Sequence, residues 1–174
     1  AEGFGAACGW KNDQQFMDQM GSPMLLAHGM GVPVKDATTV ATFPATGEYH
    51  IWVRTRDWVA GWKAPGAPGK FQVLIDRKPV EKVFGTEGAK WHWQRGGVVK
   101  IAKTKTVVSL HDLTGFDGRC DAIVFASDAD FVPPSDPKLL TPWRRKLLGL
   151  SDKPEDAGKF DLVVVGGGIA GTCS

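Results

Sequence analysis

From Ala37 onward, most of the chain alternates between apolar and polar residues with a period of two. In residues 48–56 (EYHIWVRTR), for example, Tyr49, Ile51 and Val53 fall on one face of the segment. Because successive side chains of a β-strand point to opposite faces of its sheet, this pattern predicts strands with one buried face. The predicted strands are residues 37–43, 48–56, 70–76, 82–84, 91–94, 98–102, 106–110 and 121–126.

Short stretches rich in glycine and proline separate these segments and predict turns. Short strands with turn signals at a spacing of roughly 8–12 residues are typical of antiparallel β-sandwiches. We therefore predict an all-β domain of about eight strands over residues 1–128. The predicted turns include residues 44–47, 77–79, 85–88, 96–97 and 115–118.

The first 30 residues are less regular. Residues 12–20 (NDQQFMDQM) predict one or two helical turns, and residues 23–27 (PMLLA) predict a strand.

Beyond Ser127 the composition changes. Four prolines in residues 131–142 indicate an extended linker, which we place at residues 129–159. Within it, Thr141 is a suitable N-cap, Pro142 a suitable first residue, and Gly149 a suitable residue after the helix end. These signals predict a short helix over residues 142–149.

The final segment carries a nucleotide-binding motif. The apolar run Phe160–Val165 (FDLVVV) leads directly into GGGIAG. A strand followed by G-x-G-x-x-G is the opening of a dinucleotide-binding unit, in which Gly166, Gly168 and Gly171 allow the turn and the approach of the pyrophosphate. We interpret residues 160–174 as the first strand and glycine turn of a truncated FAD-binding domain. Without the helix and the acidic residue that complete such a site, this chain is not expected to bind FAD.

Composition narrows the function classes. The 174 residues carry a formal net charge of +2 with both signs interspersed, so neither a nucleic-acid stripe nor an acidic tail is present. No apolar run approaches the roughly 18 residues of a membrane span, and no signal peptide is visible. The cellular location stays open, with export as the expectation. Cys8, Cys120 and Cys173 match no zinc spacing; Cys8 and Cys120 form either a disulfide or, as the favoured interpretation, buried thiols.

Several segments of residues 1–128 resemble a known family. They are the opening AEGF, GEYHIWVR, GKFQVLID, the Trp91-x-Trp93 strand, VVSL and CDAIVF. This set is similar to the galactose-binding-like jelly rolls, and in particular to carbohydrate-binding modules of families 6 and 35. The resemblance implies a jelly-roll sandwich, and it implies a structural calcium ion held by Glu2 and Asp121. Taken with the terminal VVVGGGIAG, the whole chain resembles the N-terminal portion of bacterial FAD-dependent oxidoreductases.

Tryptophan is the most informative residue type for binding. Trp58 and Trp62 lie in a loop where no strand pattern buries them, and Trp91 is the third candidate for an exposed indole. An indole face stacks on the C–H face of a sugar, and polar neighbours then bind its hydroxyl groups. The candidate polar groups are His28, Asp57, Lys63, His92 and Asp117. The alternative is that Trp58 and Trp62 cover the sandwich end or pack against the absent flavin domain. We expect Trp52 to be covered by the N-terminal 30 residues, or else by the catalytic domain.

Two hypotheses for the sandwich follow. In the first, it is a non-catalytic module that binds carbohydrate and brings an FAD-dependent oxidoreductase to a glycan. In the second, it is a structural domain that packs on its own flavin domain without a ligand. An adhesion-type sandwich with an accidental glycine tail is a lesser alternative. No G-x-S-x-G elbow and no carboxylate pair accompany the histidines, so we reject hydrolase chemistry.

Overall fold

The computed structural model describes residues 1, 3–151, 153 and 155–164. In this part of the chain there are ten strands, two α-helices and one 3-10 turn, and all strand pairings are antiparallel. The elements are β1 (Lys11–Asp13), α1 (Met17–Met20), β2 (Met24–His28), β3 (Ala37–Thr42), β4 (Gly47–Thr55), η1 (Ala60–Trp62), β5 (Phe71–Ile75), β6 (Lys78–Pro79), β7 (His92–Ile101), β8 (Lys105–Asp112), β9 (Phe116–Cys120), β10 (Ala122–Ala126) and α2 (Pro137–Leu147).

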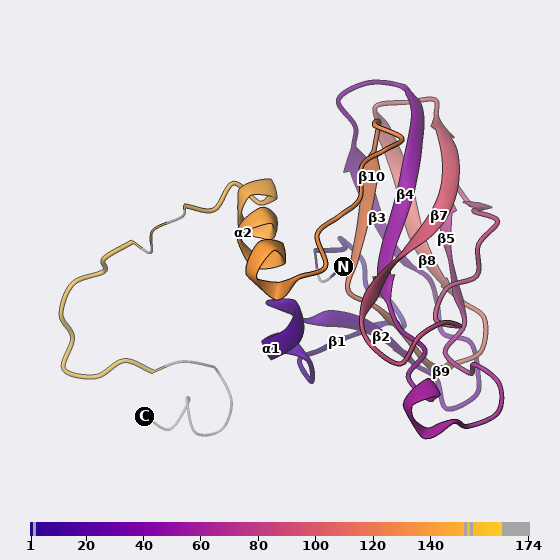
Figure 1. The fold of residues 1–174 in the computed structure, drawn as a ribbon, viewed down its shortest axis with the longest axis horizontal. Helices are drawn as coiled ribbons and strands as arrows, with labels where there is room; N and C mark the ends of the chain where they lie inside the picture. The colour runs from indigo at the N-terminus through magenta and orange to yellow at the C-terminus, as the bar shows by residue number, and fades with distance from the viewer. Residues whose placement is uncertain (2, 152, 154, 165–174) are drawn as a thin grey trace. The chain divides into compact units, whose positions relative to one another are not determined.

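Two sheets stack face to face, one with strand order β10-β4-β7 and the other with order β3-β8-β5-β6 (Figure 1). The alternating apolar residues of both sheets meet between them, so Ile51 and Val53 of β4 share one core with Val73 of β5 and Leu110 of β8. A third, smaller sheet of order β1-β2-β9 adds Leu25 and Cys120 to this core. The predicted antiparallel β-sandwich is confirmed.

Glycines inside strands caused the main errors in the predicted boundaries. Gly96 and Gly97 do not form a turn: β7 is one continuous strand with a bulge opposite Ile51. A Cβ on Gly96 would lie 2.9 Å from the Phe84 ring, so the glycine admits a core aromatic. Residues 115–118 likewise belong largely to β9 rather than to a turn. Residues 82–84, predicted as a strand, contribute only a single bridge between Phe84 and Phe71.

A second, smaller apolar cluster consists of Phe16, Met20, Met24 and Trp91. The ring centroids of Phe16 and Trp91 lie 5.7 Å apart in an edge-to-face arrangement. Trp91 is only 9% exposed. The helical turn α1 therefore serves to cover Met24 on β2 and Trp91 ahead of β7.

The segment after β10 packs on the outer face of the β10-β4-β7 sheet. The Trp93 indole donates a hydrogen bond to the Pro134 carbonyl at 3.0 Å, and Arg95 donates to the Ala129 carbonyl at 3.5 Å. The Arg95 guanidinium also lies 5.9 Å from the Trp52 ring centroid. Arg95, itself tied to the segment after β10, therefore lies over the Trp52 ring, while cover by the first 30 residues stays a prediction. Because of this attachment the first compact unit extends to Thr141, beyond residue 128.

Beneath the joint between β9 and β10 lies a buried ion pair. Arg54 donates to Asp121 Oδ2 at 2.8 Å, and the two side chains are 5% and 0% exposed. The Asp121 amide donates to the Arg54 carbonyl at 3.0 Å, and the amino group of Ala1 donates to the Asp121 carbonyl. These contacts join the start of the chain, β4 and the start of β10.

Helix α2 begins five residues before the predicted start at residue 142, so Pro142 lies inside it rather than at its first position. Asp136 provides the cap, since its carboxylate accepts a hydrogen bond from the Lys138 amide at 2.8 Å. Gly149 follows the helix with φ +66°. Residues 160–164 are exposed and form no strand in the described part of the chain; Gly166, Gly168 and Gly171 lie outside the described residues. No described helix is long and apolar enough to cross a membrane.

Truncation of the buried ion pair tests its contribution to the fold. Arg54→Met removes the guanidinium that contacts the buried Asp121 carboxylate, and we expect a loss of about 3–5 kcal/mol in the free energy of unfolding. Lys82→Met in the partly exposed Lys82–Glu87 pair is the control, with an expected loss of at most about 1 kcal/mol. Urea unfolding measures both, and the double variant Arg54→Met/Asp121→Asn should recover part of the loss. Equal losses for the two single variants would contradict the assignment.

Candidate functional site

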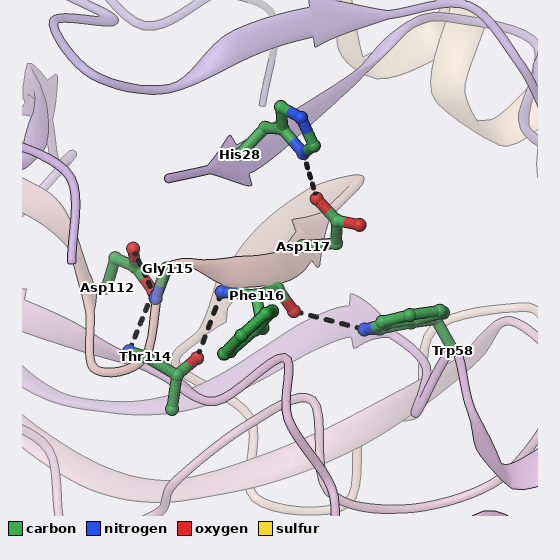
Figure 2. Close-up of polar contacts among 7 residues, drawn as sticks. All are labelled: His28, Trp58, Asp112, Thr114, Gly115, Phe116 and Asp117. Atoms are coloured by element: carbon green, nitrogen blue, oxygen red, sulfur yellow. Dashed lines mark hydrogen bonds and ion pairs between the residues drawn. The ribbon is translucent and has the colours of Figure 1, made fainter. Parts of the chain in front are cut away.

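A buried carboxylate organises the loops at one end of the sandwich. Asp112, at the end of β8, is 1% exposed and accepts hydrogen bonds from the amides of Val34, Thr114 and Gly115 at 2.9, 3.1 and 3.0 Å. The Gly115 carbonyl in turn accepts from the Gly29 amide at 3.0 Å. Figure 2 shows the Asp112 contacts with Thr114 and Gly115. Together with the Val34 and Gly29 contacts, they fix the loop before β3 and the loop before β9 to each other.

A β-bulge then directs Asp117 toward His28. Ala27 pairs with Gly118 and His28 pairs with Phe116, which leaves Asp117 as the extra residue on β9. Its φ of +57° lies in the left-handed region, which is uncommon for a residue other than glycine. Bulges of this kind re-aim a side chain. Here the Asp117 carboxylate lies 2.5 Å from His28 Nδ1, and His28 remains exposed (Figure 2).

Two indoles lie next to this pair. Trp58 is half-buried and donates its N–H to the Phe116 carbonyl at 3.0 Å, which attaches the loop after β4 to β9. Trp62, in the 3-10 turn η1, packs edge-on against Trp58 with ring centroids 5.4 Å apart and an interplanar angle of 89°. Trp62 is 72% exposed. We call the set Trp58, Trp62, Arg119, Asp117 and His28 the indole surface.

Arg119 links the aromatic and acidic parts of this surface. Its guanidinium carbon lies 5.2 Å from the Trp58 ring centroid. Burial lowers the pKa of Arg119 from its ordinary value, the neighbouring Asp117 carboxylate raises it, and Arg56 lowers it further. A guanidinium stacked on the indole restricts Trp58, so the ring against which Trp62 rests is held in place.

The structure brings four predicted binding residues together and separates the others. Trp58, Trp62, His28 and Asp117 share the indole surface, whereas Trp91 lies in the second apolar cluster. The assignment of Trp91 to a ligand surface is wrong, because its ring covers Met24 instead of facing solvent. The remaining polar candidates have these positions: Asp57 is buried and accepts from the Val59 amide, Lys63 is exposed after η1, and His92 Nδ1 lies 2.9 Å from the Lys90 carbonyl oxygen.

The predicted calcium ligands are only partly described. Asp121 is fully buried and pairs with Arg54, which already supplies a cation to its carboxylate. Glu2 lies outside the described residues. Among the residues described, no cluster of three His, Cys, Asp or Glu side chains is placed to hold a metal ion. The Arg54 pairing does not favour calcium at Asp121. Of the cysteines, Cys8 is exposed and Cys120 is buried, so the expectation of buried thiols fails for Cys8.

Two residues of this region were not predicted. Phe116 falls in a stretch that the sequence predicts as a turn, and it was not considered for binding. It begins β9, is 49% exposed and lies beside the Trp58 contact. Arg119 was not among the predicted binding residues. The hydrophobic position of Phe116 just after Thr114-Gly115 is the one sequence signal that marks it.

The fold is a β-sandwich similar to those of solved carbohydrate-binding modules. The chain is similar to a family 35 carbohydrate-binding module from an environmental isolate, with a TM-score of 0.51 and 13% identity over 75% of this chain and 94% of that one. It is also similar to a GH26-CBM35 β-(1,4)-mannanase from Podospora anserina, with a TM-score of 0.54 and 14% identity. That match covers 75% of this chain but only 27% of the mannanase chain. No protein-family model and no curated protein matches the sequence.

The close contact at Gly115 provides a test of the loop architecture. Gly115 has φ +70°, and a Cβ there would lie 2.2 Å from the Val32 carbonyl oxygen. Gly97 is the matched control, because it has φ +89° but no atom within 4 Å of a Cβ. We expect Gly97→Ala to cost about 1–2 kcal/mol of unfolding free energy. Gly115→Ala should cost a further ~1–3 kcal/mol because of the clash. Equal losses in urea unfolding would show that the two loops do not depend on this contact.

Proposed function

We propose that this chain is a non-catalytic module that binds carbohydrate through the indole surface. The observation that carries the proposal is Trp62, a large aromatic side chain that is 72% exposed and braced by Trp58. Together with Trp58 it forms an aromatic patch beside polar residues, and exposed apolar patches of this kind often mark ligand-binding sites. The flat apolar face of the Trp62 indole suits the C–H face of a sugar ring.

The polar part of the surface suits the same ligand. The Asp117 carboxylate has acceptor sites beyond its contact with His28, and the exposed imidazole has a second ring nitrogen. Sugar hydroxyl groups both donate and accept hydrogen bonds. A platform with a carboxylate and an imidazole beside it therefore offers the two kinds of contact that a carbohydrate needs.

The similarity of the fold to solved carbohydrate-binding modules suggests which ligands to test first. Both similar structures contain modules named as carbohydrate-binding, and one of them belongs to a β-(1,4)-mannanase. We therefore take mannose and β-1,4-linked mannan oligosaccharides as the first probes, followed by the glucose, xylose and galactose series.

The alternative, a structural domain that packs on a flavin domain, receives less support. That hypothesis expects Trp52 to need a cover from another domain, and the Arg95 side chain already lies against the Trp52 ring. It also leaves the bulge that directs Asp117 toward His28 without a role.

We further propose an FAD-dependent oxidoreductase as the parent of this module. The support is the sequence FDLVVV followed by Gly166, Gly168 and Gly171. The reading frame downstream of Ser174 tests it: a helix and an acidic residue about 20 residues further on should follow, and the longer protein should hold flavin. A stop codon, or a longer protein without flavin absorbance, would remove this proposal.

Calcium at Glu2 and Asp121 also stays a prediction. Titration with Ca²⁺ should raise the melting temperature of the protein, and Asp121→Asn should abolish the increase. No change on titration would exclude a stabilising calcium ion there.

Loss of Trp62 tests the binding proposal directly. We expect Trp62→Ala to weaken glycan binding at least about tenfold, as truncation of a central aromatic contact does. Phe160→Ala is the matched control, because Phe160 is an aromatic of similar exposure (63%) outside the sandwich. Affinity electrophoresis and calorimetry on all three proteins give the comparison. Equal affinities for the wild type and Trp62→Ala would remove the indole surface as the binding site.

A further inference from the structure

Three apolar side chains that the proposed site does not use are exposed on the loops beside it. Met30 is 83% exposed, Val32 is 68% exposed and Phe116 is 49% exposed. They come from the loop before β3 and from the start of β9. We call Met30, Val32 and Phe116 the apolar ledge.

The backbone beneath the ledge is fixed by hydrogen bonds. The Gly31 amide donates to the Gly115 carbonyl at 3.2 Å, and the Val32 amide donates to the Gly29 carbonyl at 3.0 Å. A Cβ on Gly31 would lie 3.0 Å from the tip of the Phe116 ring, so this ring rests on bare backbone. The Phe116 ring therefore has one side supported by Gly31 and is still about half exposed. An aromatic residue held in this way loses little conformational entropy when a ligand binds.

The ledge is attached to the indole surface through Phe116 itself. Its carbonyl accepts the hydrogen bond of Trp58, and the next residue, Asp117, carries the carboxylate that contacts His28 (Figure 2). Thr114 Oγ1 accepts a hydrogen bond from the Phe116 amide at 3.4 Å. The aromatic ring of Phe116, the Trp58–Trp62 pair and the Asp117–His28 pair are thus all positioned by one short stretch of β9.

Resting on the proposed glycan binding, we infer that Phe116 and the ledge form a second sugar subsite. The ligand is then an oligosaccharide, with one sugar unit on Trp62 and a further unit on Phe116. Trp58 positions both aromatic residues through its ring contact with Trp62 and its hydrogen bond to Phe116.

The polarity of the region favours a sugar chain over a protein partner. Burying His28 and Asp117 under an apolar protein surface would leave the polar atoms that they do not share with each other without partners, which is unfavourable. A sugar chain presents apolar C–H faces and hydroxyl groups in alternation, so it can contact two aromatic platforms and the polar pair next to them.

The test compares single sugars with their oligomers. The probes are mannose, glucose, xylose and galactose, each as the monosaccharide and as the β-1,4-linked di- to tetrasaccharide, titrated by calorimetry. We expect Phe116→Ala to weaken oligosaccharide binding about tenfold, a loss typical of a truncated aromatic contact, while monosaccharide binding stays unchanged. Trp62→Ala should weaken both. Phe116→Trp should retain the preference for the oligomers, and near-UV circular dichroism checks that each variant is folded.

The possible results separate the two proposals. Equal affinity of the wild type for a sugar and its oligomers would overturn the second subsite and leave the glycan-binding proposal standing. Phe116→Ala binding oligomers as tightly as the wild type would do the same. Binding of no sugar by the wild type would overturn both proposals.

Discussion

The buried Asp112 carboxylate holds the loops at the end of the sandwich that carries the indole surface. A carboxylate that is 1% exposed must have its charge and its lone pairs satisfied, and backbone amides of two separate loops do so. Without those amide donors, burial of the Asp112 carboxylate would cost too much free energy. Without the carboxylate, the two loops would lose the group that binds both of them. The placement of Phe116, and through its carbonyl the placement of Trp58, follows from this one requirement.

The tryptophans show how one residue type takes several roles according to its surroundings. Trp10 and Trp91 are buried, in the main core and in the small cluster under α1 respectively. Trp93 uses its N–H to attach the segment after β10. Trp58 combines a hydrogen bond with cation–π stacking, and Trp62 is left exposed. An indole carries a large apolar area and one N–H donor, so the same residue type can fill a core, attach a segment or present an exposed ring.

Period-two alternation predicts most of the long strands, because their residues face a core on one side only. It fails where backbone packs against backbone or against a ring: Gly96 and Gly118 look like turn residues, yet each lies inside a strand. The exposure of Trp62 and the candidacy of Trp58, His28 and Asp117 could be inferred from residue type and position in the sequence, whereas the edge-to-face contact of Trp58 with Trp62 could not. The bulge that brings His28 and Asp117 together could not, since it depends on the register of β2 against β9. The start of α2 was misplaced because two serviceable cap signals occur five residues apart, and Asp136-Pro137 prevails over Thr141-Pro142.

The attachment of residues 129–134 to β7 has a mechanical consequence. Pro134, whose carbonyl accepts a hydrogen bond from Trp93, belongs to the first compact unit, so a free linker starts no earlier than the end of that unit at Thr141 and not at the end of β10. Each residue of extended chain adds at most about 3.3–3.6 Å to the length of a linker. Attachment of residues 129–134 therefore makes the free linker appreciably shorter. A shorter linker raises the effective concentration of a ligand bound to the sandwich at any domain joined to it by that linker. The hydrogen bond between the Trp93 indole and the Pro134 carbonyl thus limits how far a neighbouring domain can lie from the sandwich.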